Sequence, residues 1–63
     1  MDKNLEYLLA AFQDRMRMLG DAIAHGNCMS YDEYKFACGQ IRGLEAACGI
    51  IEDLKSNLET ADD

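Results

Sequence analysis

Proline and tryptophan are absent from the 63 residues, and histidine occurs once. Without proline, no interior position is forced to end or kink a helix. A single histidine leaves little for metal ligation or nucleophilic catalysis, which need several converging groups. Apolar runs such as residues 7–12 are also far shorter than the ~18 residues that a membrane-spanning helix requires. We therefore expect a helical protein with no membrane partner.

Cysteine is present in an odd number, as Cys28, Cys38 and Cys48. At least one thiol must stay unpaired, and two lie within apparent helices, so a disulfide framework is not expected. Reduced thiols are typical of a cytosolic compartment. The first apolar stretch is interrupted by Glu6 and does not resemble a secretory signal. These features predict a cytoplasmic protein.

Cations are scarce: six Lys and Arg residues face twelve Asp and Glu residues, for a formal net charge of −6. Residues 1–25 hold four acids and three bases, whereas residues 26–63 hold eight acids and three bases. This balance argues against direct binding to nucleic acid, because phosphate neutralisation supplies most of that affinity. The ordinary role of such a surface is solubility.

Helical periodicity is the main positive feature of the sequence. Apolar residues from Leu5 to Ile23 recur at alternating steps of four and three and predict a helix over about residues 3–25. His25 and Gly26 mark its end, since a cation suits the last turn and glycine suits the left-handed residue beyond it. Further apolar residues widen the stripe enough for contact with more than one neighbour: Leu8, Ala11, Met18 and Ala22.

A second helix is predicted over about residues 31–59. Ser30 and Glu33 form a capping box, in which each side chain accepts a hydrogen bond from a backbone N–H at the helix start. Met29 and Tyr34 occupy the positions of a hydrophobic staple. The three-and-four spacing then continues through the apolar residues Tyr34, Ala37, Ile41, Leu44, Cys48, Ile51, Leu54 and Leu58.

The predicted fold is all-α, a single-domain antiparallel two-helix hairpin with coiled-coil spacing. Only residues 26–29 separate the helices, so they must run antiparallel as neighbours, and residues 60–63 are expected to form a frayed acidic tail. The second helix is longer, which leaves Leu54 and Leu58 overhanging. Because so small a core is marginal, we expect the hairpin to assemble into a helical bundle or to dock on a larger protein.

Three small residues, Gly39, Gly43 and Ala47, are spaced by four in the second helix, although each glycine costs about 1 kcal/mol relative to alanine. One interpretation is that the glycines accommodate Phe12 or Met16 inside the hairpin. The other is that they form a groove for a second chain, because small residues allow close helix approach. On the latter view the protein-interaction residues are Phe36, Gly39, Gly43, Ala47, Ile50, Leu54 and Leu58.

Groups that carry chemistry do not gather in this sequence. His25 lies beside the turn, where a capping role is expected, and with Cys28 it supplies only two of the four ligands of a closed zinc site. Ser30 already has a capping role. Glu52 and Asp53 point to different sides of a helix and form no acid/base pair. We predict no enzymatic activity, no catalytic residue, no metal site and no cofactor.

The stretch SYDEYKFACGQIRGLEAACGIIEDL resembles small helical proteins of about this length encoded by tailed bacteriophages. The likeness is carried by Tyr31, Glu33, Tyr34, residues 38–44, Ile51 and Leu54. It extends into the first helix through LLAAFQDRMRMLGDAIAHG. The resemblance implies a phage-encoded virion or accessory protein in the host bacterial cytoplasm, and it carries over no catalytic residue.

Two functions follow. The favoured one is a structural protein, a homo-oligomer, assembly factor or adaptor that contacts itself or a larger phage or host protein. The alternative is an acidic inhibitor or regulator of a host enzyme or nucleic-acid-binding protein, with carboxylates in place of phosphates. Such mimicry needs a regular row of acids. The available row is loose and is interrupted by three bases; its acids are Asp32, Glu45, Glu52, Glu59 and Asp63.

Overall fold

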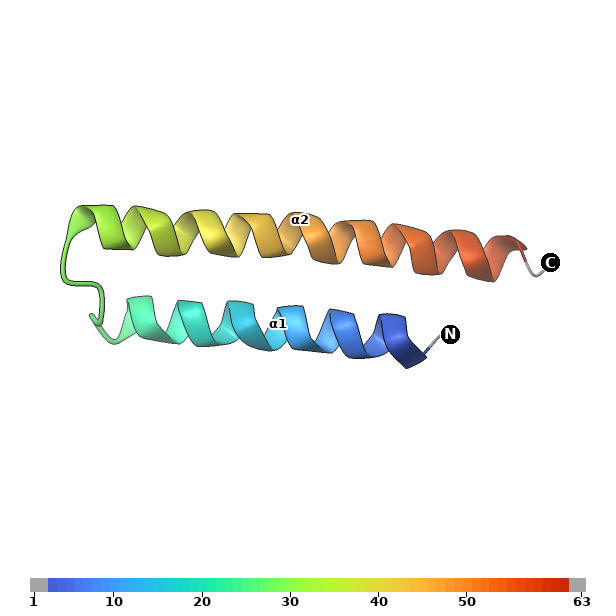
Figure 1. Cartoon of the computed structure of the whole chain (residues 1–63), viewed down its shortest axis with the longest axis horizontal. Coiled ribbons are helices and arrows are strands. Elements are labelled where there is room, and N and C mark those ends of the chain that lie inside the picture. The colour runs from blue at the N-terminus through green and yellow to red at the C-terminus, as the bar shows by residue number, and fades with distance from the viewer. Residues whose placement is uncertain (1–2, 62–63) are drawn as a thin grey trace.

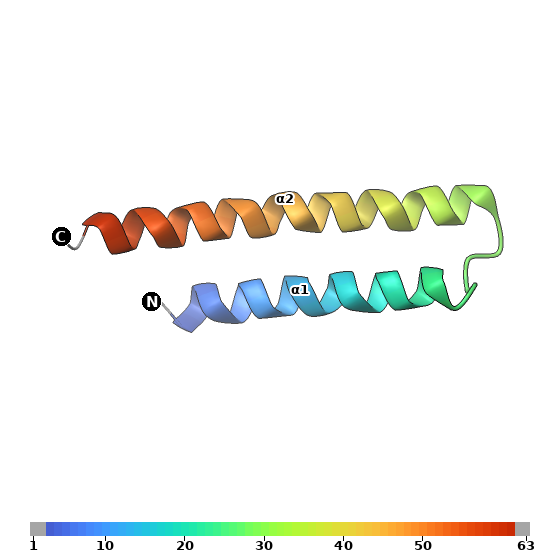
Figure 2. The ribbon, with the colours of Figure 1, turned by 180° about the vertical axis from the view of Figure 1, so that it is seen from behind.

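The computed structural model describes residues 3–61. Within this range the chain forms two α-helices, α1 (Lys3–Ala24) and α2 (Tyr31–Ala61), and no strand. The helices lie side by side and antiparallel, as both views show (Figures 1 and 2). The hairpin measures 50 × 16 × 13 Å. The predicted all-α antiparallel hairpin is confirmed.

The end of α1 is closed by backbone hydrogen bonds around Gly26. This glycine has a φ of 71°, a left-handed conformation that side chains with a Cβ rarely adopt. Its N–H donates to the Ile23 carbonyl over 3.1 Å, and the Asn27 N–H donates to the Ala22 carbonyl over 2.9 Å. This pair of bonds is the Schellman motif, which satisfies the last carbonyls of a helix. Gly26 therefore terminates α1 as the sequence predicts.

The start of α2 is capped by Ser30, with one difference from the predicted capping box. The Glu33 N–H donates to Ser30 Oγ over 3.1 Å, as expected. The Glu33 carboxylate accepts instead from the Met29 N–H over 2.6 Å, one residue before the predicted donor. The predicted staple between Met29 and Tyr34 is wrong, because Met29 is 85% exposed. Tyr34 stacks on Tyr31 with ring centroids 6.4 Å apart.

The far end of α2 is more ordered than predicted. We expected a frayed tail over residues 60–63, yet α2 continues through Ala61. Thr60 Oγ1 donates to the Ser56 carbonyl over 2.9 Å, a bond to the preceding turn that is compatible with a continuing helix. Residues 62 and 63 lie outside the described range. In Figure 1 the end of α2 extends past the start of α1, which is the predicted overhang.

The core is a narrow seam between the helices. Among residues 3–61, full burial is reached at Cys48 and Ile51, which are 6% and 8% exposed. Tyr34, at the turn end of the predicted stripe, stays exposed. Leu54 and Leu58, in the overhang, are also exposed. The predicted seam residues that lie between the two helices are half-buried: Leu5, Leu9, Phe12, Met16, Leu19, Ile23, Ala37, Cys38, Ile41 and Leu44. One layer of contacts thus holds the hairpin together and leaves its sides open.

Candidate interaction surface

Several of the exposed apolar side chains on the two helices lie one residue before a seam residue. On α1 these are Leu8 and Met18, and on α2 they are Phe36 and Ile50; Leu54 lies about one helical turn beyond Ile50, on the same side. One residue back along a helix is a rotation of about 100° from the seam. Both helices are right-handed, run in opposite directions and turn their seams towards each other. The residue before a seam residue therefore faces the same side of the hairpin on both helices. These five exposed side chains therefore share one face, whereas the exposed Tyr7 and Tyr31 do not precede a seam residue and lie elsewhere.

A shallow depression confirms that positions from both helices meet on this side. It has a volume of about 340 Å³ and is lined by Arg15 of α1 and by Gln40, Gly43 and Leu44 of α2. Arg15, Gln40 and Gly43 each precede a seam residue. We call this side the apolar face, and it comprises Leu8, Ala11, Arg15, Met18, Phe36, Gln40, Gly43, Ala47, Ile50 and Leu54.

The glycines of α2 have no role in packing inside the hairpin. Within the described part of the chain, a Cβ at Gly39, Gly43 or Gly49 would meet no atom within 4 Å beyond its own local backbone. The interpretation that they accommodate Phe12 or Met16 is therefore wrong. The lost helix propensity, about 1 kcal/mol per glycine, has no compensation within one chain.

Five of the seven predicted interaction residues fall on the apolar face: Phe36, Gly43, Ala47, Ile50 and Leu54. Gly39 lies farther round α2, on the side directed away from α1. Leu58 continues the seam line and is exposed. The predicted set omits the contribution of α1, although the broad apolar stripe of Leu8, Ala11 and Met18 was a signal for it.

The opposite side of the hairpin, which we call the polar face, carries charges of both signs, because positions one residue after a seam residue include Arg17, Lys35 and Arg42 as well as glutamates. Glu45, Glu52 and Glu59 are exposed and lie seven residues apart, so they form one row along α2. Asp32 does not share this spacing, and Asp63 lies outside the described range. The predicted acidic row therefore reduces to three glutamates.

Charge also divides the hairpin along its length. The turn half, residues 14–44, holds four acids and four bases and is formally neutral. The described part of the open half, residues 3–13 and 45–61, holds five acids and two bases, for a formal charge of −3. The other three acids, Asp2, Asp62 and Asp63, lie outside the described range.

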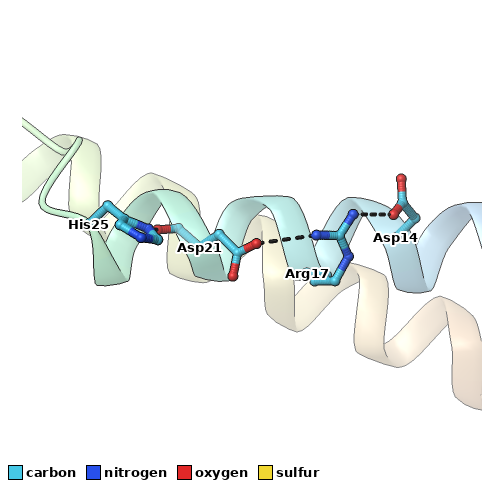
Figure 3. Close-up of polar contacts among 4 residues, drawn as sticks. All are labelled: Asp14, Arg17, Asp21 and His25. Carbon is cyan, nitrogen blue, oxygen red and sulfur yellow. Dashed lines mark hydrogen bonds and ion pairs between the residues drawn. The ribbon is translucent and has the colours of Figure 1, made fainter.

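Some charges of the turn half are neutralised locally along α1 (Figure 3). Arg17 lies between two carboxylates, 2.7 Å from Asp14 and 3.3 Å from Asp21. The hydrogen bond to Asp14, followed by the negative charge of Asp14, raises the pKa of Arg17. His25 Nδ1 lies 2.7 Å from the Asp21 carbonyl oxygen and donates to it when protonated. His25 thus contributes to the helix end, which is the predicted capping role.

Near the turn, Tyr34 interacts with the Cys38 thiol. A hydrogen bond with this thiol is the main cause that raises the pKa of the Tyr34 hydroxyl above its ordinary value. Cys28, Cys38 and Cys48 are free thiols. Across residues 3–61, no group of three His, Cys, Asp or Glu side chains is arranged to hold a metal ion. Neither described helix is long and apolar enough to traverse a bilayer.

Comparisons of the chain with protein-family models, with curated proteins and with solved structures gave no match.

Proposed function

We propose that this protein is a non-enzymatic interaction protein that binds another polypeptide through the apolar face. The observation that carries this proposal is its surface area. The chain exposes 4868 Å², whereas a folded monomer of this mass exposes about 4,000 Å². The excess of about 800 Å² comes from the open sides of a two-helix rod, and it is of the same order as one partner's share of a standard protein–protein interface.

The composition of the apolar face supports the same conclusion. Its large side chains include Phe36 and Ile50, which are 60% and 69% exposed. Between Leu8 and Met18 on α1 and between Phe36 and Leu54 on α2, Arg15 is the single ionisable residue of the face. Depletion of charge with enrichment in aromatic residues, methionine and arginine is typical of the centre of an interface.

The proposed role is that of a small structural or assembly protein of a tailed bacteriophage, acting in the cytoplasm of the host bacterium. The phage origin is supported by the resemblance over residues 30–54. The hairpin form suits such a role because a rigid rod with one apolar face can be added to a larger assembly through a single surface.

The alternative role is an acidic regulator of a host enzyme or nucleic-acid-binding protein. The observation in its favour is the row formed by Glu45, Glu52 and Glu59, together with the charge of the open half. Binding through that row would weaken steeply with added salt. Binding through the apolar face would respond weakly.

Affinity capture of the tagged chain from the host bacterium, with an untagged copy co-expressed, tests the proposal. Ile50→Glu places a charge on the apolar face, and the matched control Ser56→Glu adds the same charge to exposed α2 surface outside that face. We expect wild type and Ser56→Glu to retain a stoichiometric polypeptide and Ile50→Glu to lose it. Equal capture by both variants, or no capture by wild type, would contradict the proposal.

A further inference from the structure

We propose that the polypeptide bound by the apolar face is a second copy of this chain, packed so that the turn of one hairpin lies beside the open end of the other. This inference rests on the proposed function. The result is an antiparallel four-helix bundle with two-fold symmetry, in which the two apolar faces form the centre.

The first argument is the shape of the apolar face. Its middle is formed by small residues on both helices, Ala11 on α1 and Gly43 and Ala47 on α2. Bulky side chains lie towards both ends, with Phe36 near the turn and Leu54 near the open end. Two such helices that cross at an angle approach most closely at their small middle residues, and the bulky side chains fill the space that widens towards the ends.

The second argument is the register of α2. Phe36 and Leu54 are placed symmetrically about the level of residue 45, and so are Gly43 and Ala47. A two-fold axis perpendicular to the helices at this level therefore places Phe36 against Leu54 of the second copy. The same axis places Gly43 against Ala47 of the second copy, where the missing side chains permit close approach of the backbones.

The register of α1 agrees with this axis. Ala11 lies near the level of residue 45, because each helix runs a similar distance from the turn to these positions. The axis then pairs Ala11 with its own equivalent and places Arg15 beside Leu8 of the second copy. The aliphatic part of Arg15 covers apolar surface there, and its guanidinium extends to solvent at the edge.

The third argument is charge. If both turns lay at the same end, the two open halves, each with a formal charge of −3 over the described residues, would lie together. In the antiparallel arrangement each open half lies beside a neutral turn half. Like charges placed side by side cost free energy, so electrostatics favours the antiparallel arrangement.

The fourth argument is the unexplained glycine. A Cβ at Gly43 would meet no atom within 4 Å beyond its local backbone, and Gly43 lines the depression in the middle of the apolar face. In the proposed dimer this position lies at the closest approach of the two α2 helices. The loss of helix propensity at Gly43 is then offset by the contact between the α2 helices of the two chains.

Sedimentation equilibrium of the reduced, purified protein tests self-association. We expect wild type to be a dimer at micromolar concentrations. Gly43→Leu fills the depression and should weaken dimerisation at least tenfold. The matched control Gly49→Leu makes the same replacement on α2 away from the apolar face and should leave dimerisation unchanged. Circular dichroism verifies that each variant remains helical.

Isotope-filtered nuclear Overhauser spectra of a mixture of labelled and unlabelled wild-type chains test the orientation. Phe36 and Leu54 are about 27 Å apart along one helix, because 18 residues separate them. A cross-peak between the Phe36 ring and the Leu54 methyl groups must therefore join two chains, and we expect to observe it. Cross-peaks between Phe36 and Met18 of different chains, without those to Leu54, would overturn the antiparallel arrangement.

The two proposals fail in different ways. A purified wild-type chain that stays monomeric at high micromolar concentration, while capture of another host or phage protein depends on Ile50, would overturn the dimer and leave the interaction function standing. Loss of both the dimer and the capture would overturn both proposals.

Discussion

The turn half and the open half of the hairpin are stabilised by different physical means. The hydrogen bonds and ion pairs that shape the path of the chain are concentrated among residues 14–34. Among residues 3–61, the two buried side chains, Cys48 and Ile51, both belong to the open half. Local polar contacts thus determine where the chain reverses. At the open end, where no turn connects the helices, burial of apolar side chains holds them together. The open half therefore depends most on packing.

The largest effect is expected from truncating the core of the open half. Ile51→Ala removes a buried side chain and should lower the free energy of unfolding by about 2–4 kcal/mol. Ile23→Ala, the matched change in the half-buried seam of the turn half, should cost about half as much. Urea denaturation at one fixed protein concentration measures both values. A larger loss for Ile23→Ala would reverse the comparison between the halves.

The next effect concerns the turn itself. Gly26→Ala forces a residue with a Cβ into the left-handed conformation, at a cost of about 1–2 kcal/mol in the free energy of unfolding. The φ of 71° is the reason, because space is available around Gly26. Gly20→Ala is the control, since it lies in helical conformation with similar free space and should stabilise α1. Thermal denaturation of the two variants should shift in opposite directions, and shifts in the same direction would contradict the role of φ.

A smaller effect is expected at the start of α2. Ser30→Ala removes the acceptor of the Glu33 N–H and should lower the free energy of unfolding by about 1 kcal/mol. Ser56→Ala, an exposed serine inside the same helix, should change it by a few tenths of a kcal/mol in the favourable direction. Amide exchange of Glu33 should accelerate in Ser30→Ala alone. Unchanged exchange there would mean that the cap does not protect the helix start.

Much of the fold could be predicted because its determinants are local in sequence. Gly26 and Ser30 act on backbone groups within a few residues, and the seam follows from spacing along each helix. The hydrogen-bond partner of the Glu33 carboxylate could not be predicted, because two adjacent N–H donors compete for it within one turn. The end of α2 lies two residues beyond its predicted position, at Ala61, because the sequence holds no residue after Glu59 that fixes a helix end.

The interaction surface was only half predictable. The set on α2 was visible as small and bulky residues outside the seam, such as Gly43 and Ile50. The surface continues onto α1 because, in two antiparallel helices, the residues just before the seam residues face the same side of the hairpin. The spacing of residues along one helix does not reveal this. The role of the glycines could be decided only from the structure. The atoms around each glycine show whether its missing side chain makes room for another residue of the hairpin.

The smallest effect concerns the contact between Tyr34 and Cys38 in the turn half. The raised pKa of Tyr34 means that the folded chain retains the phenolic proton more strongly than the unfolded chain, whose tyrosine titrates near 10. The associated stability is present below pH 10 and is lost as pH rises through the folded-state pKa. Cys38→Ala removes the hydrogen bond and should lower the Tyr34 titration midpoint, measured by NMR of its ring. Cys48→Ala removes a thiol from the open half and should leave the midpoint in place, so an equal shift in both variants would show that the effect does not arise from this contact.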